Sequence, residues 1–593
     1  MSLAKFDLAI VVGGAAGQGV ATPGNILTKL FARRGLNSYA YNAFQSIIRG
    51  GHCLLTFRVS EQEVFTHGDK FDILITLNQD TMNRHLKHMR PGTWVIYNSD
   101  SITPGEADDG VHFCKMPVKE LSNNNRNKLI QNTAAIAAVL GIMNLELEAF
   151  EEIVKAQFKR KGQEVVDANL GVARAAYQHA QDNYPSFEAE VPFGAKPLGI
   201  WNGNTAIAIG AAAAGVKFYC AYPMSPSTGI LHWIAQNARE LGIMVRQVED
   251  EIGVITMAIG AAHAGCRTMC ATSGGGFALM TEGVGAAGMM EIPLVIVDVQ
   301  RSGPSTGVPT KTEQGDLWQV LGASQGDFPR FIVAPRDAVD SFNTIPMLFN
   351  LVDKYQCPSI VLSDQLIAEG NFTFDPDEID MHPNIDRGEL ITEPSETNGY
   401  MRYKITESGI SPRALPGLEG RIHVVSTDEH QEDGVLISDE YTHPHKRQAM
   451  MEKRQRKMIG VEKEIEPPKL EGPEDSNVTL IGWGSTYGVI HEAIEQLSDE
   501  GITANHLHIK WIVPFHGEVV SDILSRCNKT IIVENNYSGL FHRYMRSETG
   551  LTVDSHIRKY DGEPFMPHHI VDGVKEILEK ETETFVPVHE IIV

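Results

Sequence analysis

Four short apolar runs, each followed by a loop rich in glycine, proline, hydroxyl or acidic residues, constrain the fold of this chain most strongly. The runs are "KFYCAY" (217–222), "IMVRQV" (243–248), "CRTMCAT" (266–272) and "PLVIVDVQ" (293–300). Helical patterns lie between them, so strands and helices alternate, as in a parallel α/β sheet. The loops that follow the strands' carboxyl ends are 222–228, 249–251, 273–276 and 301–310. That edge of an open α/β sheet is where ligands bind.

Two further α/β segments flank this region. The N-terminal one begins with "FDLAIVV" (6–12), continues into a glycine-rich turn and a helix, and contains the buried runs 71–77 and 93–98. It ends near residue 185, where "QDNYPSFEAEVPFGAKP" is typical of a linker. The last one starts at "SNVTLIGWGSTYG", and the charged, proline-containing sequence before it predicts a partly ordered connector with a surface helix. The predicted segments are 1–185, 195–375, 376–475 and 476–593.

Composition excludes several classes of function. The chain has 51 basic and 75 acidic residues, a net charge of −24, which argues against a nucleic-acid partner. Its seven cysteines form no C-x-x-C pair, which predicts a reduced, cytoplasmic protein with neither a cluster nor a zinc site of its own. The N-terminus lacks the features of a signal peptide, and the most apolar stretch, "TAIAIGAAAAGV", is short for a membrane span. We therefore expect a soluble protein with no membrane partner.

Three adjacent acids precede the small-residue helix in "QVEDEIGVITMAIGAAHAG". Acids in a first helical turn complement the helix dipole, and this alone would explain Glu249, Asp250 and Glu251. A carboxylate buried beside such an uncharged run, however, needs a partner. Glu251, the last of the three, is therefore a candidate functional residue.

Stiff loops with hydroxyl groups follow the first and fourth strands. In "YPMSPSTG", Pro223 and Pro226 restrict the backbone beside Ser225, and Thr228 is expected to be an ordinary helix N-cap. In "RSGPSTGVPT", Arg301 ends a buried strand, where its guanidinium suits a bidentate grip on a carboxylate. A structural ion pair is the alternative for this arginine.

The N-terminal segment carries a weaker signal. "GGAAGQGV" places Gly14, Gly17 and Gly19 where a phosphate-cradling turn would lie, although it lacks the Lys-Ser/Thr of a P-loop. Tight-turn packing is equally compatible with it. Arg49 precedes a glycine pair in "IIRGGH", where a surface turn is the simpler interpretation.

Taken in order and spacing, "YPMSPSTG", "EDEIGVITMAIGAAHAG", "TSGGGFALMTEG" and "RSGPSTGVPTKTEQGDL" resemble the α subunit of the 2-oxoacid:ferredoxin oxidoreductases. The first 185 residues, with "GGAAGQGV" and "RGGH", resemble the family's γ domain, and the C-terminal segment resembles a transketolase-type domain. The resemblance implies a multidomain α/β fold: a Rossmann-like γ domain, a thiamine-diphosphate pyrimidine-binding domain, a connector and a transketolase C-terminal-like domain. It implies conversion of a 2-oxoacid and coenzyme A to acyl-CoA and carbon dioxide, with two electrons passed to ferredoxin.

The same resemblance assigns residues. Glu251 would hydrogen-bond the aminopyrimidine ring of thiamine diphosphate and so promote removal of the thiazolium C2 proton. Tyr222, Pro223 and Ser225 would lie against the cofactor. The 2-oxoacid would be held by Ser225, Arg301, Thr306 and Thr310. Independently of the resemblance, the glycine-rich loops make Gly14, Gly17, Gly19 and Arg49 a candidate loop for coenzyme A or phosphate. The family usually has threonine at the position of Ser225, so substrate preference does not follow from that residue.

Two expected elements are missing from the sequence. It has no "GDG"-type segment for Mg²⁺ and diphosphate and no four-cysteine set for a cluster. In the resembled family both belong to a β subunit, so the chain is expected to bind no metal itself. It would share thiamine diphosphate and Mg²⁺ with a [4Fe–4S]-bearing β subunit, in an (αβ)₂ heterotetramer that ferredoxin oxidises.

Several alternatives remain open. The resemblance favours 2-oxoglutarate and succinyl-CoA, as in the TCA cycle or in CO₂ fixation, but leaves pyruvate, branched-chain 2-oxoacids and the direction of the reaction undetermined. A thiamine-dependent transketolase-like enzyme without electron transfer is a second interpretation. A nucleotide-binding scaffold without enzymatic activity is a third, because fold alone does not fix function.

Overall fold

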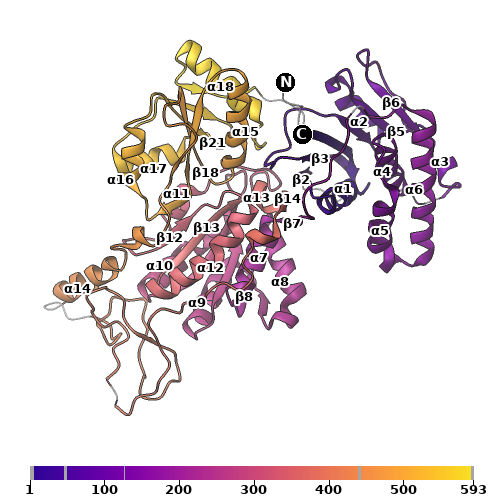
Figure 1. Ribbon diagram of the computed structural model, residues 1–593. Helices are drawn as coiled ribbons and strands as arrows, with labels where there is room; N and C mark the ends of the chain where they lie inside the picture. Colours follow the sequence, from indigo (N-terminus) through magenta and orange to yellow (C-terminus); the bar gives the residue numbers. More distant parts are fainter. Residues whose placement is uncertain are drawn as a thin grey trace.

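The computed structural model describes residues 6–45, 50–125, 127, 129–187, 189–397, 399–437 and 443–588, and it has three α/β units and a projecting connector (Figure 1). Each unit is built on its own sheet, so the predicted multidomain α/β class is confirmed.

The N-terminal unit has a mixed sheet rather than a simple alternation of parallel strands. Its own strands are β1 (Asp7–Ala16), β2 (Asn37–Ala43), β3 (Gly50–Ser60), β4 (Ile73–Thr76), β5 (Trp94–Asn98) and β6 (His112–Met116). β1, β4, β5 and β6 are parallel, whereas β3 runs antiparallel to both β1 and β2. The helices are α1 (Ala21–Arg33), α2 (Gln79–His85), α3 (Val118–Leu121), α4 (Ile130–Ile142), α5 (Leu147–Phe158) and α6 (Gln163–Asn183).

Two further strands complete this sheet, one from the start and one from the end of the middle segment. β14 (Asn371–Phe374) pairs with β2, and β7 (Gly199–Asn202) pairs with β14, both antiparallel. The amide of Ser38 donates to Thr373 Oγ1 at 2.6 Å. Main-chain pairing therefore ties the N-terminal unit to the unit that follows.

The middle unit is a seven-stranded sheet in the order β20-β12-β13-β11-β10-β8-β9. The strands are β8 (Phe218–Ala221), β9 (Met244–Gln247), β10 (Thr268–Thr272), β11 (Leu294–Gln300), β12 (Phe331–Val333), β13 (Pro358–Asp364) and β20 (Trp511–Val513). β8 to β13 are parallel. The helices are α7 (Gly203–Ala213), α8 (Thr228–Leu241), α9 (Glu251–His263), α10 (Gly274–Met289), α11 (Leu317–Leu321), α12 (Ala338–Tyr355) and α13 (Gln365–Glu369). All four strands expected between residues 217 and 300 are present, so the four loops do share one sheet edge.

The C-terminal unit has the sheet order β17-β19-β18-β21-β22-β23. Its strands are β17 (Leu470–Glu471), β18 (Val478–Trp483), β19 (Ala504–Ile509), β21 (Thr530–Glu534), β22 (Ser555–Arg558) and β23 (Thr584–Phe585), and its helices are α15 (Thr486–Asp499), α16 (Gly517–Leu524), α17 (Leu540–Thr549) and α18 (Pro567–Lys580). β20 leaves this unit and pairs antiparallel with β12, which joins it to the middle sheet.

The connector forms the arm at the lower left of Figure 1 and contains β15 (Leu390–Ile391), β16 (Arg413–Ala414) and α14 (His443–Arg456). α14 is more than the expected surface helix, because Lys453 lies fully buried in an ion pair with Glu291 of the middle unit (2.6 Å). Arg413 likewise pairs with buried Asp353 at 2.9 Å. Buried ion pairs thus connect the connector to the middle unit, in a segment with few apolar residues.

Candidate active site

Asp250 and Glu251 have different surroundings at the start of α9. Asp250 is the N-cap, and its carboxylate accepts from the amides of Ile252 (3.0 Å) and Gly253 (3.3 Å). Glu251 is only 3% exposed, and its Oε1 has no hydrogen-bond partner among the described residues. Because Asp250 already caps the helix, capping does not explain why Glu251 is buried.

Glu251 faces the amino end of α10. A Cβ added at Gly276 would lie 2.5 Å from Glu251 Oε1 and 2.1 Å from Thr272 Oγ1, so only glycine fits there. Burial raises the pKa of Glu251, and the charges of Asp250 and Glu249 add to that rise. A buried carboxyl with a free oxygen is suited to a nitrogen-containing group that the chain itself does not supply.

The loop after β8 lies beside this carboxyl. Its Met224 sulfur is 3.9 Å from Thr272 Oγ1. The Ser227 hydroxyl donates to Met224 O (2.7 Å), and Asn204, which sequence reasoning missed, donates to Pro226 O (2.9 Å). The N-cap of α8 is Ser227, so the expectation for Thr228 was wrong. These contacts fix the loop that carries three predicted residues: Tyr222, Pro223 and Ser225.

A cleft of about 590 Å³ opens at the same sheet edge. It is lined by Met224, Gly274, Gly275, Ala278, Arg301, Gly303, Pro304, Ser305, Thr306, Glu313, Gly315, Asp316 and Gln319. Arg301 Nη1 donates to Ser225 O at 2.7 Å, while its Nε has no partner within the described ranges. The structure therefore brings Ser225, Arg301 and Thr306 together, but Thr310 is buried and does not line the cleft.

Sequence reasoning missed the acids of this cleft. Glu313 and Asp316 line it, and Asp298 on β11 is buried close behind. The available signal was an aspartate inside the otherwise apolar run "PLVIVDVQ", since buried carboxyls in strands are rare without a partner.

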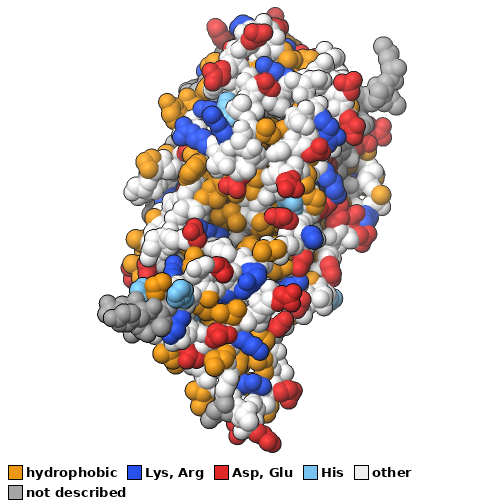
Figure 2. Space-filling model, turned by 90° about the vertical axis from the view of Figure 1, so that its left-hand side faces the viewer, with side chains coloured by type: hydrophobic (Ala, Val, Ile, Leu, Met, Phe, Trp, Pro, Cys, Tyr) orange, Lys and Arg blue, Asp and Glu red, His pale blue; other side chains and the backbone are white. Residues whose placement is uncertain are grey.

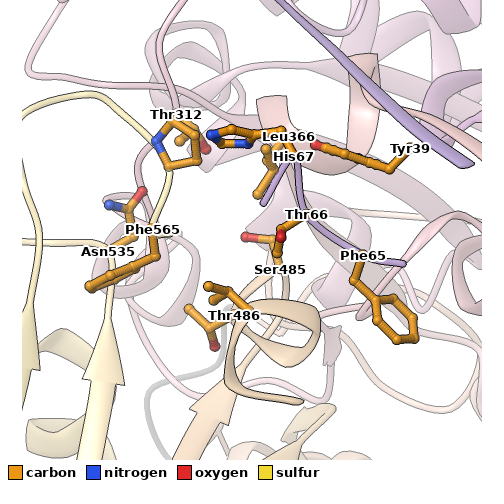
Figure 3. Close-up of a pocket in the computed structure, with 12 residues that line it drawn as sticks. Tyr39, Phe65, Thr66, His67, Thr312, Leu366, Ser485, Thr486, Asn535 and Phe565 are labelled. Carbon is orange, nitrogen blue, oxygen red and sulfur yellow. The ribbon is translucent and has the colours of Figure 1, made fainter. Parts of the chain in front are cut away.

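The loop after β11, which lines much of the cleft, is hydrogen-bonded at its end to the C-terminal unit. The fully buried Gln314 side chain donates to Trp483 O (2.8 Å) and accepts from the amide of Asn535 (3.1 Å). Thr312 N donates to Gly562 O at 3.1 Å. Figure 3 shows the cavity beside this contact, where Thr312, Asn535 and His67 bring side chains from three units together.

The glycine-rich N-terminal loop differs from the expected turn. β1 continues through Ala16, so Gly14 belongs to the strand, and the turn contains Gly17 (φ +92°) and Gly19 (φ +73°). Gly17 lines a second cleft of about 590 Å³, together with Gln18, Leu77, Asn78, Gln79, Asn98, Asp100, Ser101, Val118, Lys119, Ser122, Asn125, Asn127, Leu129, Ile130 and Gln131. Gly14 and Gly19 do not line it, and Arg49 lies outside the described residues.

The described residues contain no group of three or more His, Cys, Asp or Glu side chains placed to hold a metal ion. Within the same residues, no helix combines the length and apolarity needed to cross a membrane.

Comparison with known proteins identifies the family. The family described as "Pyruvate flavodoxin/ferredoxin oxidoreductase, thiamine diP-bdg" matches residues 209–452. "Pyruvate ferredoxin/flavodoxin oxidoreductase" matches 9–179, and "Transketolase, C-terminal domain" matches 470–540.

Relatives align over nearly the whole chain. The α subunit of a 2-oxoacid:ferredoxin oxidoreductase from Saccharolobus solfataricus is 31% identical over 96% of this chain and 98% of its own. The 2-oxoglutarate oxidoreductase subunit KorA of Mycobacterium tuberculosis is 30% identical over 86% of this chain and 82% of its own.

A solved structure agrees with these matches. The 2-oxoglutarate:ferredoxin oxidoreductase of Magnetococcus marinus, with 2-oxoglutarate, coenzyme A and succinyl-CoA bound, superimposes with a TM-score of 0.88 at 32% identity, over 96% of this chain and 99% of that one. The middle unit is thus a thiamine-diphosphate-binding domain, and the chain belongs to the α subunits of the 2-oxoacid:ferredoxin oxidoreductases, a family of oxidoreductases.

Proposed function

We propose that this chain supplies the activating carboxylate and the substrate cleft of a 2-oxoglutarate:ferredoxin oxidoreductase. The reaction would interconvert 2-oxoglutarate plus coenzyme A with succinyl-CoA plus carbon dioxide, and ferredoxin would carry the electrons. The observation that carries the proposal is Glu251, which is buried beside a glycine that keeps space open at the amino end of α10 and whose Oε1 has no partner in the described part of the chain.

Glu251 fits the aminopyrimidine ring of thiamine diphosphate. When bound, this cofactor supplies a carbanion that attacks the 2-oxo carbon and holds the electrons released by loss of carbon dioxide. The raised pKa of Glu251 favours a carboxyl that shares a proton with a ring nitrogen. Tyr222, Pro223 and Ser225 lie in the neighbouring loop, where they would support the ring.

The cleft beside Glu251 suits the 2-oxoacid. Arg301 donates to Ser225 O, and its Nε, which has no partner among the described residues, can donate to a substrate carboxylate. Thr306 lines the same cleft. Thr310, which is buried away from the lining, would act only by holding the loop.

A partner subunit would complete the site. The helices next to Glu251 expose the apolar side chains Ile252 (54%), Met257 (39%) and Leu279 (49%). In the view of Figure 2, hydrophobic side chains gather at mid-height, in a hollow between the C-terminal unit above and the connector below. We assign the Mg²⁺–diphosphate half of the site and the [4Fe–4S] cluster to a β subunit in an (αβ)₂ assembly. This subunit would cover the exposed apolar side chains of α9 and α10.

Coenzyme A is assigned to the N-terminal unit. The cleft beside Gly17 is rich in side-chain amides, which can hydrogen-bond an adenine ring or a phosphate, and Lys119 supplies a positive charge. The seven free cysteines are consistent with a reducing, cytoplasmic setting.

The test is turnover by the complex that purifies with this chain. Viologen reduction should require coenzyme A and should be fastest with 2-oxoglutarate among 2-oxoglutarate, pyruvate and branched-chain 2-oxoacids. In the same complex, Glu251→Gln should slow exchange of the thiazolium C2 proton into deuterium oxide by about 10²–10⁴-fold, because the proton-sharing carboxyl is lost.

The matched control is Glu240→Gln, which changes an exposed acid on α8 and should leave the exchange rate unchanged. Exchange at the wild-type rate in Glu251→Gln would refute the role of Glu251. Turnover of pyruvate in preference to 2-oxoglutarate would refute only the choice of substrate.

A further inference from the structure

Asp298 is the most deeply buried acid near the cleft. It is 0% exposed, and neither carboxyl oxygen has a hydrogen-bond partner in the part of the chain that the structure describes. Val297 and Val299 pack in one core cluster, whereas Leu294 and Ile296 pack in another with residues of α10 and α11. Because side chains alternate along a strand, Asp298 points toward α10 and α11.

Asp316 lies on the cleft side of Asp298. Its amide donates to Gln300 Oε1 on β11 at 3.1 Å, which places it over the end of that strand. A Cβ added at Gly274 would lie 2.3 Å from Asp316 Oδ1 and 2.5 Å from Oδ2. The carboxyl of Asp316 therefore packs against the first residue of α10, and its Oδ2 has no partner among the described residues.

The charges that face Asp316 are unbalanced. The loop after β11 contributes Arg301 and Glu313, and β11 contributes Asp298. α10 begins with glycines, and α11 contributes the neutral Gln319 to the cleft wall. The carboxylate of Glu313 accepts from Ser302 Oγ at 2.8 Å and is partly satisfied by that bond. Arg301 is the single cation of the lining residues, against two carboxyls in the wall and one behind it.

The surroundings of Asp316 place the pKa of its carboxyl near neutrality. Burial raises its pKa to about 7, the charge of Glu313 adds to the rise, and Arg301 opposes it. Burial raises the pKa of Asp298 much further, and the facing charge of Asp316 adds to that rise, so Asp298 keeps its proton when Asp316 ionises.

We propose that Asp316 binds the second anionic group of a dicarboxylate 2-oxoacid in its protonated form, so that substrate binding takes up one proton from solvent. The inference rests on the proposed function and extends it to substrate choice. Arg301 can neutralise one carboxylate, and an ionised Asp316 would repel the other. A protonated Asp316 instead donates an O–H to it, and the proton returns to solvent when the product leaves.

The chemistry separates dicarboxylates from monocarboxylates. With 2-oxoglutarate, the assembled complex should show a KM that rises about tenfold per unit above pH 7, while kcat changes little, because the ionised form rejects the substrate. A monocarboxylate such as pyruvate has no second carboxylate and should show a KM nearly independent of pH in this range.

Variants isolate the titrating group. Asp316→Asn should flatten the pH dependence of KM for 2-oxoglutarate, because the amide donates at every pH. Glu313→Gln should move the midpoint to lower pH, since a facing charge is removed. Asp298→Asn should retain the dependence, because it replaces a neutral acid with a neutral amide.

Calorimetric titration of the thiamine-diphosphate-free complex with 2-oxoglutarate, in buffers of different ionisation enthalpy, gives a readout independent of turnover, because no 2-oxoacid is decarboxylated without the cofactor. Wild type should take up close to one proton per substrate near pH 8, and Asp316→Asn none. No proton uptake in wild type, or an unchanged pH profile in Asp316→Asn, would overturn the inference even if 2-oxoglutarate turns over. Should Asp316→Asn fail to fold, an unshifted midpoint in Glu313→Gln would overturn it. Absence of any 2-oxoacid turnover would instead refute the proposed function.

Discussion

Gln314→Met tests whether the C-terminal unit positions the substrate loop. Methionine has nearly the volume of glutamine but no polar group, so it removes both side-chain hydrogen bonds to Trp483 O and to the amide of Asn535 without leaving a cavity. Trp483 O and Asn535 N both face the Gln314 side chain, which is fully buried. Water therefore cannot easily replace its amide as their hydrogen-bond partner. The main-chain bonds from Gln314 N to Asn535 O (2.8 Å) and from Thr312 N to Gly562 O (3.1 Å) remain.

The magnitude follows from those two orphaned groups. A buried donor or acceptor left unsatisfied costs about 1–3 kcal/mol, so the variant should lose about 2–6 kcal/mol of contact between loop and C-terminal unit. A domain's stability is about 5–15 kcal/mol, so the variant should fold but hold the loop less firmly. We expect faster hydrogen exchange in residues 301–316 and a higher KM for the 2-oxoacid, because Arg301 is carried by that loop.

The control is Gln178→Met on α6, whose amide donates to Asp182 on the exposed surface (2.8 Å). It should change stability by no more than about 0.5 kcal/mol. The reasoning would be refuted if the free energy of unfolding of Gln314→Met lay within about 1 kcal/mol of the wild-type value and hydrogen exchange in residues 301–316 were unaltered. The C-terminal unit would then not position the cleft.

Three further variants or conditions test other contacts. Arg301→Ala should lower kcat/KM for the best 2-oxoacid by a factor that corresponds to about 1.5–3 kcal/mol, with thiamine diphosphate still bound, because the arginine is assigned to the substrate; steady-state kinetics and cofactor content measure this. Gly276→Ala should destabilise the protein by about 1–3 kcal/mol and disturb Glu251, since its Cβ would lie 2.5 Å from Oε1; thermal unfolding and C2 exchange measure this. Raising the pH from about 7 to about 9 should stabilise the fold by about 1–2 kcal/mol, because burial lowers the pKa of Lys453 to about 7 and the unfolded chain then binds more protons than the folded one. Urea unfolding of wild type against Lys453→Met, which keeps Glu291 paired with Lys457, isolates that contribution.

Each of these has a matched control. Arg239→Ala changes an exposed arginine on α8 and should leave kcat/KM unchanged. Gly171→Ala lies in α6 with nothing within 4 Å of its added Cβ and should stabilise the helix by about 0.5–1 kcal/mol. A pH response in Lys453→Met equal to that of wild type, or normal C2 exchange in Gly276→Ala, would contradict the corresponding contact.

The four strands of the middle sheet could be predicted because their signal is local. β11 is buried along its whole length, and a short apolar run between glycine-rich loops is typical of a parallel strand covered on both faces. The loops after β8 to β11 then had to share an edge, and this is why Glu251, Ser225 and Arg301 could be expected at one place without a structure.

Pairing between distant segments was not predictable. The strands β7 and β14 join the N-terminal sheet although about 160 residues or more separate each of them from β2, and nothing in their four-residue sequences specifies that partner. α14 was expected on the surface because its sequence is highly charged, yet Lys453 is buried because it pairs with Glu291, 162 residues earlier in the chain.

The same limit applies within the site, where the residues missed are those whose roles depend on a neighbour distant in the chain. Glu251 stood out because a carboxylate buried beside an uncharged run of small residues needs a partner, and that run is visible in the sequence. Gln314 is an ordinary polar residue until Trp483 and Asn535 close over it, and Asp316 acquires its unusual chemistry only because Gly274 and the end of β11 enclose its carboxyl. Burial of a polar group thus marks Gln314 and Asp316 as candidates for a role in the cleft, and it becomes visible only when the units are packed together. The substitutions that discriminate best between function and stability are accordingly those that keep a side chain's shape and remove its polarity.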